Sequence, residues 1–505
     1  MHKITAFVMV GAMTLNIGGF CAYGAPEWPS DTGVMADFGI VMDVDSKAVL
    51  FGQQIHVPSP PASITKLLTA LVVVEHASMD EIVEFSHDAV YNVESGSGNK
   101  MSLEEGDRLS VEDCLYLLIL QSSNQAANAL AEHVAGSREA FADMMNDKAA
   151  SLGCLDGTHF TNPSGLNDDA QKVSAYDMAL IAIAAFENEK VLEISSSKFH
   201  EIPATVNNPE GVGFRMEHRI LMADSTDGTY YCEGAAAGKI GYTSLAGNTL
   251  VTYAVRDGRR QVSVILKGSQ PQYYIDGKNL LNFGFRSFIN VGIAENETLF
   301  QGIEQIEIGG VSYEVSDLAI EEEGVITLPN GGQFTDASRS LDTDIPQDAP
   351  AGSVAILQYT YNDRKVGAAY IYQKSVRAAA IAEAERESRE AEAATATATE
   401  ASLDEDLSQS DVDTLADPTV PEPRRRLFEG MSVDFGGMGI YIAAVVGVLV
   451  VIAAGGLLIW RKRKKEREAA ARRRERRRQR LQDIGYSEEE FEKLMEERRG
   501  RGREH

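Results

Sequence analysis

Hydrophobic and polar positions in the first 190 residues predict two strands followed by a long helical region. Residues 37–52 alternate as two strands joined at a turn, Asp45-Ser46-Lys47. Residues 63–77 carry the apolar periodicity of a helix, and a group of prolines at 58–61 stops the helix from starting earlier. Further helical patterns follow, including residues 111–135 and 174–186.

Strand patterns then return. Residues 248–256 and 259–268 flank Asp257-Gly258, the clearest hairpin signal in the chain. A last helix is expected at 276–289. The order of strands, helices, strands and a helix predicts an α+β domain with one antiparallel sheet and an inserted helical region.

The pattern changes after residue 295. Residues 295–375 contain short alternating strands with Gly and Asn turns, which predict a small all-β domain. Residues 376–438 form a linker, Ala/Glu-rich and helical in its first part, then rich in Asp, Ser and Pro and disordered to about 437. We therefore expect the folded body to stand on a stalk.

Two apolar segments lie near the ends of the chain. Residues 1–24 resemble a secretory signal peptide cut after Gly24, the alternative being an uncleaved anchor. Residues 439–460 carry no charge and are long enough for a transmembrane helix, and RKRKK follows directly. The basic flank predicts a single-pass protein of the cell membrane with an extracytoplasmic body and a cytoplasmic C-terminus.

The distribution of charge supports this division into an extracytoplasmic body and a cytoplasmic tail. The net charge of −28 separates into −35 for residues 1–460 and +7 for residues 461–505. An acidic body argues against nucleic acid as its partner. The basic tail is read as a stop-transfer segment near anionic lipid heads, the alternative being a nucleic-acid patch, and any cytoplasmic partner stays unknown. Cys114, Cys154 and Cys232 are too few for a disulfide scaffold, and Cys114 is expected in the core.

Ser63-Ile64-Thr65-Lys66 is the candidate nucleophile motif. Three residues apart on a helix places the Ser and Lys side chains on one face. A serine needs a base beside it, and burial can lower the pKa of a lysine enough to supply one. A second copy of the pattern, residues 195–198, lacks an apolar helix behind it and is interpreted as a surface loop.

Ser122-Ser123-Asn124 is the second motif and lies between two apolar helical runs. Ser122 could relay a proton from Lys66 to the leaving amine, and Asn124 could orient substrate or Lys66. Helix capping by Ser and Asn is the alternative. A similar triplet, Ser97-Gly98-Asn99, is expected in a polar loop.

Lys239-Ile240-Gly241, followed by Tyr242, is the third motif and precedes the hairpin at the edge of the sheet. Lys239 would supply positive potential that keeps Lys66 neutral and attracts a carboxylate. Gly241 would let a substrate backbone approach closely.

Together, in this order, the motifs resemble the SxxK, SxN and KTG set of penicillin-recognising serine enzymes. PASITKLLTA, FTNPSGL and GYTSLAGNTLV are similar to the D-alanyl-D-alanine carboxypeptidase family, the low-molecular-weight penicillin-binding proteins, over residues 30–290. The resemblance implies a catalytic domain over 25–294, followed by that family's β-rich domain.

The resemblance also implies a reaction. Ser63 attacks the penultimate D-Ala carbonyl of a peptidoglycan pentapeptide stem, Lys66 takes its proton, and the N–H groups of Ser63 and Tyr242 form the oxyanion hole. Free D-Ala leaves and water hydrolyses the acyl-enzyme. β-Lactam antibiotics acylate the same serine, and neither a metal nor another cofactor is expected.

Two departures from the family pattern concern the substrate carboxylate. Ile240 replaces the usual Thr, and residues 268–277 lack an Arg that many members carry there. These departures keep open a catalytically weak or non-catalytic peptidoglycan-binding scaffold. A β-lactamase is a third alternative, although no Glu-x-x-x-Asn element lies between Asn124 and Lys239.

Overall fold

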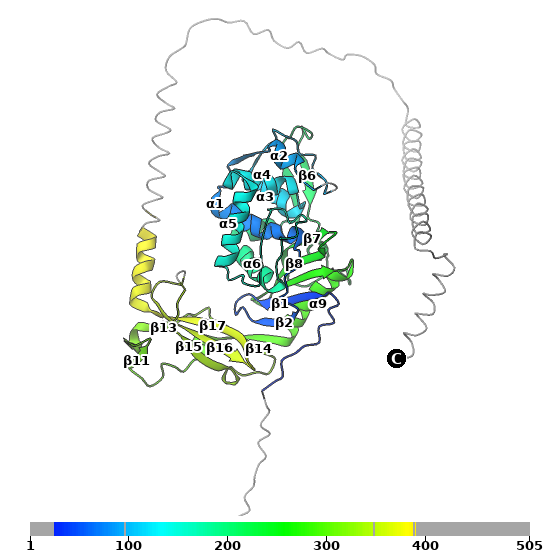
Figure 1. Cartoon of the computed structure of the whole chain (residues 1–505). Helices are drawn as coiled ribbons and strands as arrows, with labels where there is room; N and C mark the ends of the chain where they lie inside the picture. Colours follow the sequence, from blue (N-terminus) through cyan, green and yellow to red (C-terminus); the bar gives the residue numbers. More distant parts are fainter. Residues whose placement is uncertain (1–24, 95–96, 347–348, 387–388, 390–505) are drawn as a thin grey trace, which may run out of the picture. The chain divides into compact units, whose positions relative to one another are not determined.

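A computed structural model describes residues 25–94, 97–346, 349–386 and 389, which all belong to one compact unit (Figure 1). Within these ranges, no helix is both long and apolar enough to cross a membrane. The predicted signal peptide, most of the linker, the span at 439–460 and the basic tail lie outside the described residues. The described start of the linker, residues 376–386, is helical.

The central sheet of the first domain has five antiparallel strands in the order β2-β1-β9-β8-β7. The hairpin expected around Asp257-Gly258 is confirmed, since both turn residues have positive φ, 50° and 77°, as a type I′ turn requires. The strands are β1 Phe38–Asp43, β2 Val49–Gln53, β7 Ala235–Thr243, β8 Gly247–Arg256 and β9 Arg259–Gly268.

Helices cover both faces of this sheet. On β1, Ile40 and Met42 join the core beneath the helical region, whereas Val41 joins the core beneath α9 Gln272–Ser287. This alternation explains why β1 is buried along its whole length. The helical region comprises α1 Lys66–His76, α3 Val111–Leu120, α4 Asn124–Ala135, α5 Arg138–Ser151, α6 Ala175–Glu187 and α7 Glu189–Ser196.

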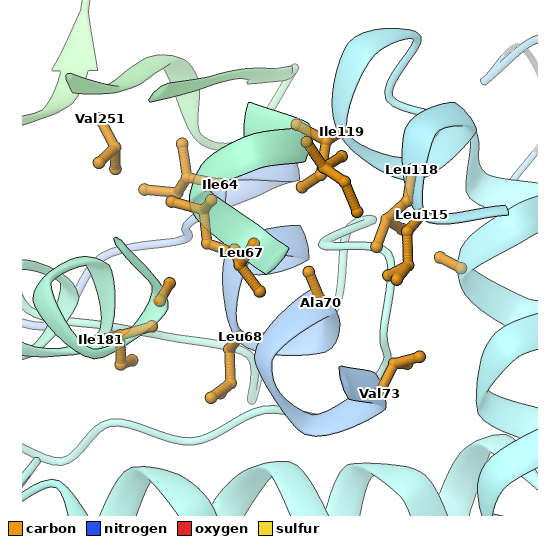
Figure 2. Close-up of a cluster of buried hydrophobic side chains, with 14 of the residues drawn as sticks. Ile64, Leu67, Leu68, Ala70, Val73, Leu115, Leu118, Ile119, Ile181 and Val251 are labelled. Atoms are coloured by element: carbon orange, nitrogen blue, oxygen red, sulfur yellow. The ribbon is translucent and has the colours of Figure 1, made fainter. Parts of the chain in front are cut away.

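Helix α1 runs through the middle of the helical region. Figure 2 shows its apolar side chains, such as Leu67 and Leu68, among residues of α3, α6 and β8 that include Leu115, Ile181 and Val251. Eight of its eleven residues are buried. A helix packed on all sides is a rigid support for a reactive group at its N-terminus.

Three details of the sequence prediction are wrong. The helix expected at 63–77 begins at Lys66, because residues 62–65 form a 3₁₀ turn. The last helix spans Gln272–Ser287 rather than 276–289. The second SxxK copy is not a surface loop, because Ser195 lies in the last turn of α7 and is fully buried under that amphipathic helix.

A second sheet follows α9 directly, so β structure begins at Phe288, earlier than the predicted start at 295. Its strands run antiparallel in the order β10-β14-β17-β16-β15, and β13 also pairs with β17. They are β10 Phe288–Gly292, β13 Leu318–Ile320, β14 Val325–Pro329, β15 Ser338–Asp342, β16 Ser353–Tyr361 and β17 Arg364–Gln373.

Candidate active site

Ser63 lies on the 3₁₀ turn that leads into α1, and Lys66 is the first residue of that helix. Their side chains meet as the spacing predicted, with Lys66 Nζ 3.1 Å from Ser63 Oγ. Two features fix the turn: Ala62 adopts a left-handed φ of 52°, and the Thr249 hydroxyl of β8 donates to the carbonyl of Pro61 at 2.8 Å. Strained backbone held by packing is common where a reactive side chain must be aimed.

Lys66 is fully buried and has three oxygen partners. Besides Ser63 Oγ, its Nζ lies 2.8 Å from Asn124 Oδ1 and 2.5 Å from the main-chain oxygen of Ser164. The amide oxygen and the carbonyl can only accept hydrogen bonds. In a neutral amine the two N–H groups would satisfy these acceptors, and the lone pair would face the Ser63 hydroxyl. The geometry therefore suits a general base.

Burial is the main reason that the pKa of Lys66 is well below its usual value. The positive charges of Lys239 and Lys100 lower this pKa further. Among the residues that the structure describes, the hydrogen-bond partners of Lys66 are a hydroxyl, an amide and a carbonyl, and none is a carboxylate. The neutral form is thus favoured, as proton abstraction requires.

The second motif joins α3 to α4 and separates its two serines. Ser123 is the N-cap of α4 and its hydroxyl accepts a hydrogen bond from the N–H of Ala126. Ser122 has a left-handed φ of 57° and lines the cleft in front of Ser63. Capping therefore falls to Ser123, which leaves Ser122 available for proton transfer, and Asn124 contacts Lys66.

The third motif lies on β7, beside Ser63. A Cβ on Gly241 would stand 2.7 Å from the Ser63 nitrogen and 2.5 Å from Thr249 Oγ1, so only glycine allows this approach. Lys239 is buried, its Nζ donates to the carbonyl of Ile240 at 3.0 Å, and burial lowers its pKa to about 7. Tyr242 is 67% exposed beside the cleft.

These residues surround a cleft of about 370 Å³. The structure places five of the seven predicted site residues on its wall, and the other two, Lys66 and Lys239, are buried behind it. Ser97 of the similar triplet, Ser97-Gly98-Asn99, also lines the cleft. The wall consists of Ser63, Glu94, Ser97, Lys100, Ser122, Asn124, Leu166, Asn167, Glu217, Ile240, Gly241, Tyr242, Thr243, Ser244 and Tyr273.

The loop that carries Ser164 and Gly165 lies in FTNPSGL, residues 160–166, which counted toward the family resemblance, but neither residue was predicted to belong to the site. Gly165 has a φ of 80°, and a Cβ there would lie 1.9 Å from the carbonyl oxygen of Ala62. This contact brings the loop against the nucleophile turn and delivers the Ser164 carbonyl to Lys66. Asn162-Pro163-Ser164-Gly165 looks like an ordinary turn, and a main-chain acceptor leaves no signature in residue type.

Two charged residues of the cleft were also missed. Lys100 Nζ lies 2.7 Å from each carboxylate oxygen of Glu217. The next residue, His218, is fully buried, and burial lowers its pKa to about 3, so its ring is too weakly basic to be a candidate base. In the described part of the chain, no group of three or more His, Cys, Asp or Glu side chains could hold a metal ion.

Comparisons with known proteins agree with this arrangement. The family model for D-alanyl-D-alanine carboxypeptidases matches residues 26–270. The D-alanyl-D-alanine carboxypeptidase DacD of Escherichia coli is 31% identical over 323 residues, covering 62% of this chain and 78% of that protein. DacB2 of Mycobacterium tuberculosis, which has the same enzyme name, is 32% identical over 268 residues and is covered to 84%.

Solved structures share the fold. Penicillin binding protein 6B from Escherichia coli superposes with a TM-score of 0.50 at 25% identity, covering 69% of this chain and 98% of that chain. Penicillin binding protein 5 from Haemophilus influenzae gives a TM-score of 0.53 at 24% identity, covering 67% and 96%. The coverage extends past the region matched by the family model.

Proposed function

Because this chain belongs to the family of D-alanyl-D-alanine carboxypeptidases, a family of serine peptidases, we propose that Ser63 removes the terminal D-Ala from peptidoglycan pentapeptide stems. The main support for assigning Ser63 and Lys66 is the environment of the Lys66 side chain. This lysine is fully buried, 3.1 Å from Ser63 Oγ, and held by two obligate acceptors. Penicillin, as a mimic of the same substrate end, acylates the same oxygen.

Acylation begins with proton transfer from Ser63 Oγ to the neutral Nζ of Lys66. The freed oxygen attacks the carbonyl of the penultimate D-Ala, and the carbonyl oxygen takes up negative charge. Main-chain N–H groups of Ser63 and Tyr242 stabilise that charge, an interaction whose loss costs about 10²–10³-fold in rate in other serine peptidases. The closeness of Gly241 to the Ser63 nitrogen supports this position for the oxyanion hole.

Collapse of the intermediate then breaks the peptide bond. The leaving amine of D-Ala takes a proton, which Ser122 passes on from Lys66, and free D-Ala departs. Water then adds to the ester on Ser63, and Lys66 accepts its proton. As the bond to Ser63 Oγ breaks, Lys66 returns that proton to the oxygen, and the shortened stem is released. Asn124 keeps Lys66 in place throughout through its 2.8 Å contact.

We also propose that the enzyme works outside the cell on a single membrane anchor. The support is in the sequence: the leader at 1–24, the apolar segment at 439–460 and the basic residues that follow. Trp28, four residues after the predicted cleavage site, donates its indole N–H to the carbonyl of Leu50 at 2.9 Å and so belongs to the folded body. External protease on whole cells should remove the catalytic domain and leave the tail protected. Protection of both would exclude this orientation.

Release of D-Ala from a pentapeptide stem tests the function directly. The purified protein should release one D-Ala per stem, and Ser63→Ala should release none. Ser195→Ala is the matched control, because Ser195 has the same SxxK spacing but lies in α7, and it should keep wild-type activity. Stem binding without D-Ala release would favour the non-catalytic scaffold, and fast turnover of penicillin would favour the β-lactamase.

A further inference from the structure

The cleft in front of Ser63 has two chemically different ends. Strand β7 passes the nucleophile at Gly241, so Lys239 and Ile240 lie toward one end and Ser244 toward the other. A strand advances about 3.3 Å per residue, so the ends are well separated. The terminal carboxylate of a substrate must occupy one of them.

Glu94 belongs to the Ser244 end. Its carboxylate accepts from the Asn167 side chain at 2.8 Å, and that same amide lies 3.5 Å from the Ser244 hydroxyl. No lysine or arginine side chain offsets the charge of Glu94 at this end. Lys100 is the only Lys or Arg on the cleft wall, and it pairs with Glu217. This end therefore repels a carboxylate.

Lys100 and Glu217 belong to the opposite end, beside Lys239. Lys100 Nζ also lies 3.3 Å from the carbonyl of Gln121, the residue before Ser122. Glu217 precedes His218, whose ring would lie 2.9 Å from a Cβ on Gly238, next to Lys239. We name Lys100, Glu217, Lys239 and Ile240 the Lys100 end.

Lys100 is the accessible cation of this end. Its side chain is 50% exposed, whereas Lys239 is only 2% exposed and donates to a main-chain carbonyl. Ile240 offers no hydroxyl. The three N–H groups of Lys100 already have three acceptors, the two oxygens of Glu217 and the carbonyl of Gln121. A substrate carboxylate that binds Lys100 must therefore replace one of these acceptors, and Glu217 supplies two of the three.

We propose that Lys100 binds the terminal carboxylate of the stem peptide and that Glu217 is an internal carboxylate that the substrate displaces. The exchange is feasible because Glu217 is 37% exposed, and ion pairs at such exposure contribute little stability. Before the exchange, Lys100 and a protonated Lys239 outweigh the charge of Glu217, so this end carries a net positive charge that attracts the incoming carboxylate. Lys100 thus takes over a task that the Ile240 side chain cannot perform.

Two substrates that differ only at the end test this assignment, which rests on the proposed function. One stem ends in D-Ala-D-Ala with a free carboxylate, and the other ends in the uncharged D-alaninamide. Lys100→Met should raise KM for the carboxylate substrate about tenfold or more, as loss of a charge-assisted hydrogen bond requires. KM for the amide substrate should change less than about twofold by the same reasoning, since it has no charge to lose. Its kcat should fall at pH values where Lys66 is partly protonated, because Lys100 helps to lower the pKa of Lys66.

The variant Glu217→Gln tests whether Glu217 competes with the substrate carboxylate for Lys100 or only positions Lys100. Removal of the internal carboxylate should lower KM for the carboxylate substrate severalfold and leave the amide substrate unchanged. A raised KM would show that Glu217 only positions Lys100 and would overturn the displacement. Lys148→Met is the matched control, because Lys148 pairs with Glu75 at 2.6 Å with 26% and 32% of the side chains exposed, away from the cleft wall.

Equal effects of Lys100→Met on both substrates, or no effect on either, would overturn the role of Lys100. Turnover of the amide substrate by the variant with an unchanged KM also shows that it folds. Failure of the function itself looks different: the wild-type protein would then release neither D-Ala nor D-alaninamide, and the Lys100 assignment would fall with it.

Discussion

The reaction centre and the Lys100 end of the cleft are built in opposite ways. In the reaction centre, formed by Ser63, Lys66, Ser122 and Asn124, the base is fully buried and two residues adjoining the nucleophile adopt left-handed backbone. At the Lys100 end, the charged pair is exposed and exchangeable. The difference indicates that chemistry is held by packing, whereas recognition of the substrate end depends on surface contacts.

This comparison makes a general prediction about kinetics. Changes in the reaction centre should lower kcat for every substrate. Changes at the Lys100 end should act mainly on KM for substrates that end in a carboxylate. An interaction made equally in the ground state and the transition state alters KM alone.

Lys66→Ala should have the largest effect. Loss of a positioned general base costs about 10²–10⁴-fold in rate, and kcat should fall by this factor for carboxylate and amide substrates alike. Lys198→Ala is the matched control, because Lys198 occupies the same position in the second SxxK copy but is exposed. Retention of more than a tenth of the activity by Lys66→Ala would contradict the role of Lys66 as the base of the reaction centre.

Gly165→Ala should come next. A Cβ there would meet the Ala62 carbonyl at 1.9 Å, so the Ser164 carbonyl must move away from Lys66. We expect kcat to fall at least about tenfold, because small misplacements near the chemistry are costly. Gly136→Ala controls for strain alone, since Gly136 has a φ of 76° and nothing within 4 Å. Both variants should lower Tm, but only Gly165→Ala should lower kcat.

Ile240→Thr should act in the opposite direction. A hydroxyl at this place can donate to the substrate carboxylate, and a charge-assisted hydrogen bond is worth about 1.5–3 kcal/mol, or roughly ten- to a hundredfold in affinity. We expect KM to fall by up to this factor for the carboxylate substrate. Ile240 lines the cleft and packs partly against the core under α9, so a Tm measurement should accompany the kinetics. Equal gains on the amide substrate would contradict a role for this residue in carboxylate binding.

The pH dependence of kcat/KM should show the smallest effect. Burial lowers the pKa of Lys239 to about 7, so the free enzyme loses this positive charge as the pH rises through 7. The carboxylate substrate should therefore lose up to about tenfold in kcat/KM per pH unit above that point. The amide substrate should lack this alkaline limb, while both substrates should share the rise in rate that comes as Lys66 loses its proton. Identical alkaline limbs would assign the titration to the reaction centre.

The sequence predicted the reaction centre better than the Lys100 end for a physical reason. Ser63 and Lys66 meet through local helix geometry, and Ser122 and Asn124 follow an apolar helix that can be recognised from its periodicity. Lys100 and Glu217 are 117 residues apart and meet only in the folded chain. No pattern of residue types predicts such a pair.

The main-chain contacts were equally beyond prediction. The carbonyl of Ser164 contacts Lys66 from 98 residues away, and only the fold reveals it. The second SxxK copy shows the converse error. Ser195 belongs to a helix because the apolar face of α7, with Val191 and Ile194, packs against the core. The run of serines at 195–197 is polar and therefore suggested a loop.

Acylation by a labelled penicillin, followed by mass mapping of the labelled peptide, tests the central claim most directly. The wild-type protein should carry one label per chain, on the peptide that contains Ser63. Ser63→Ala should carry none, and Ser195→Ala should be labelled as the wild type is. A label that persists in Ser63→Ala, or that maps to another serine, would contradict the assignment of Ser63 as the nucleophile.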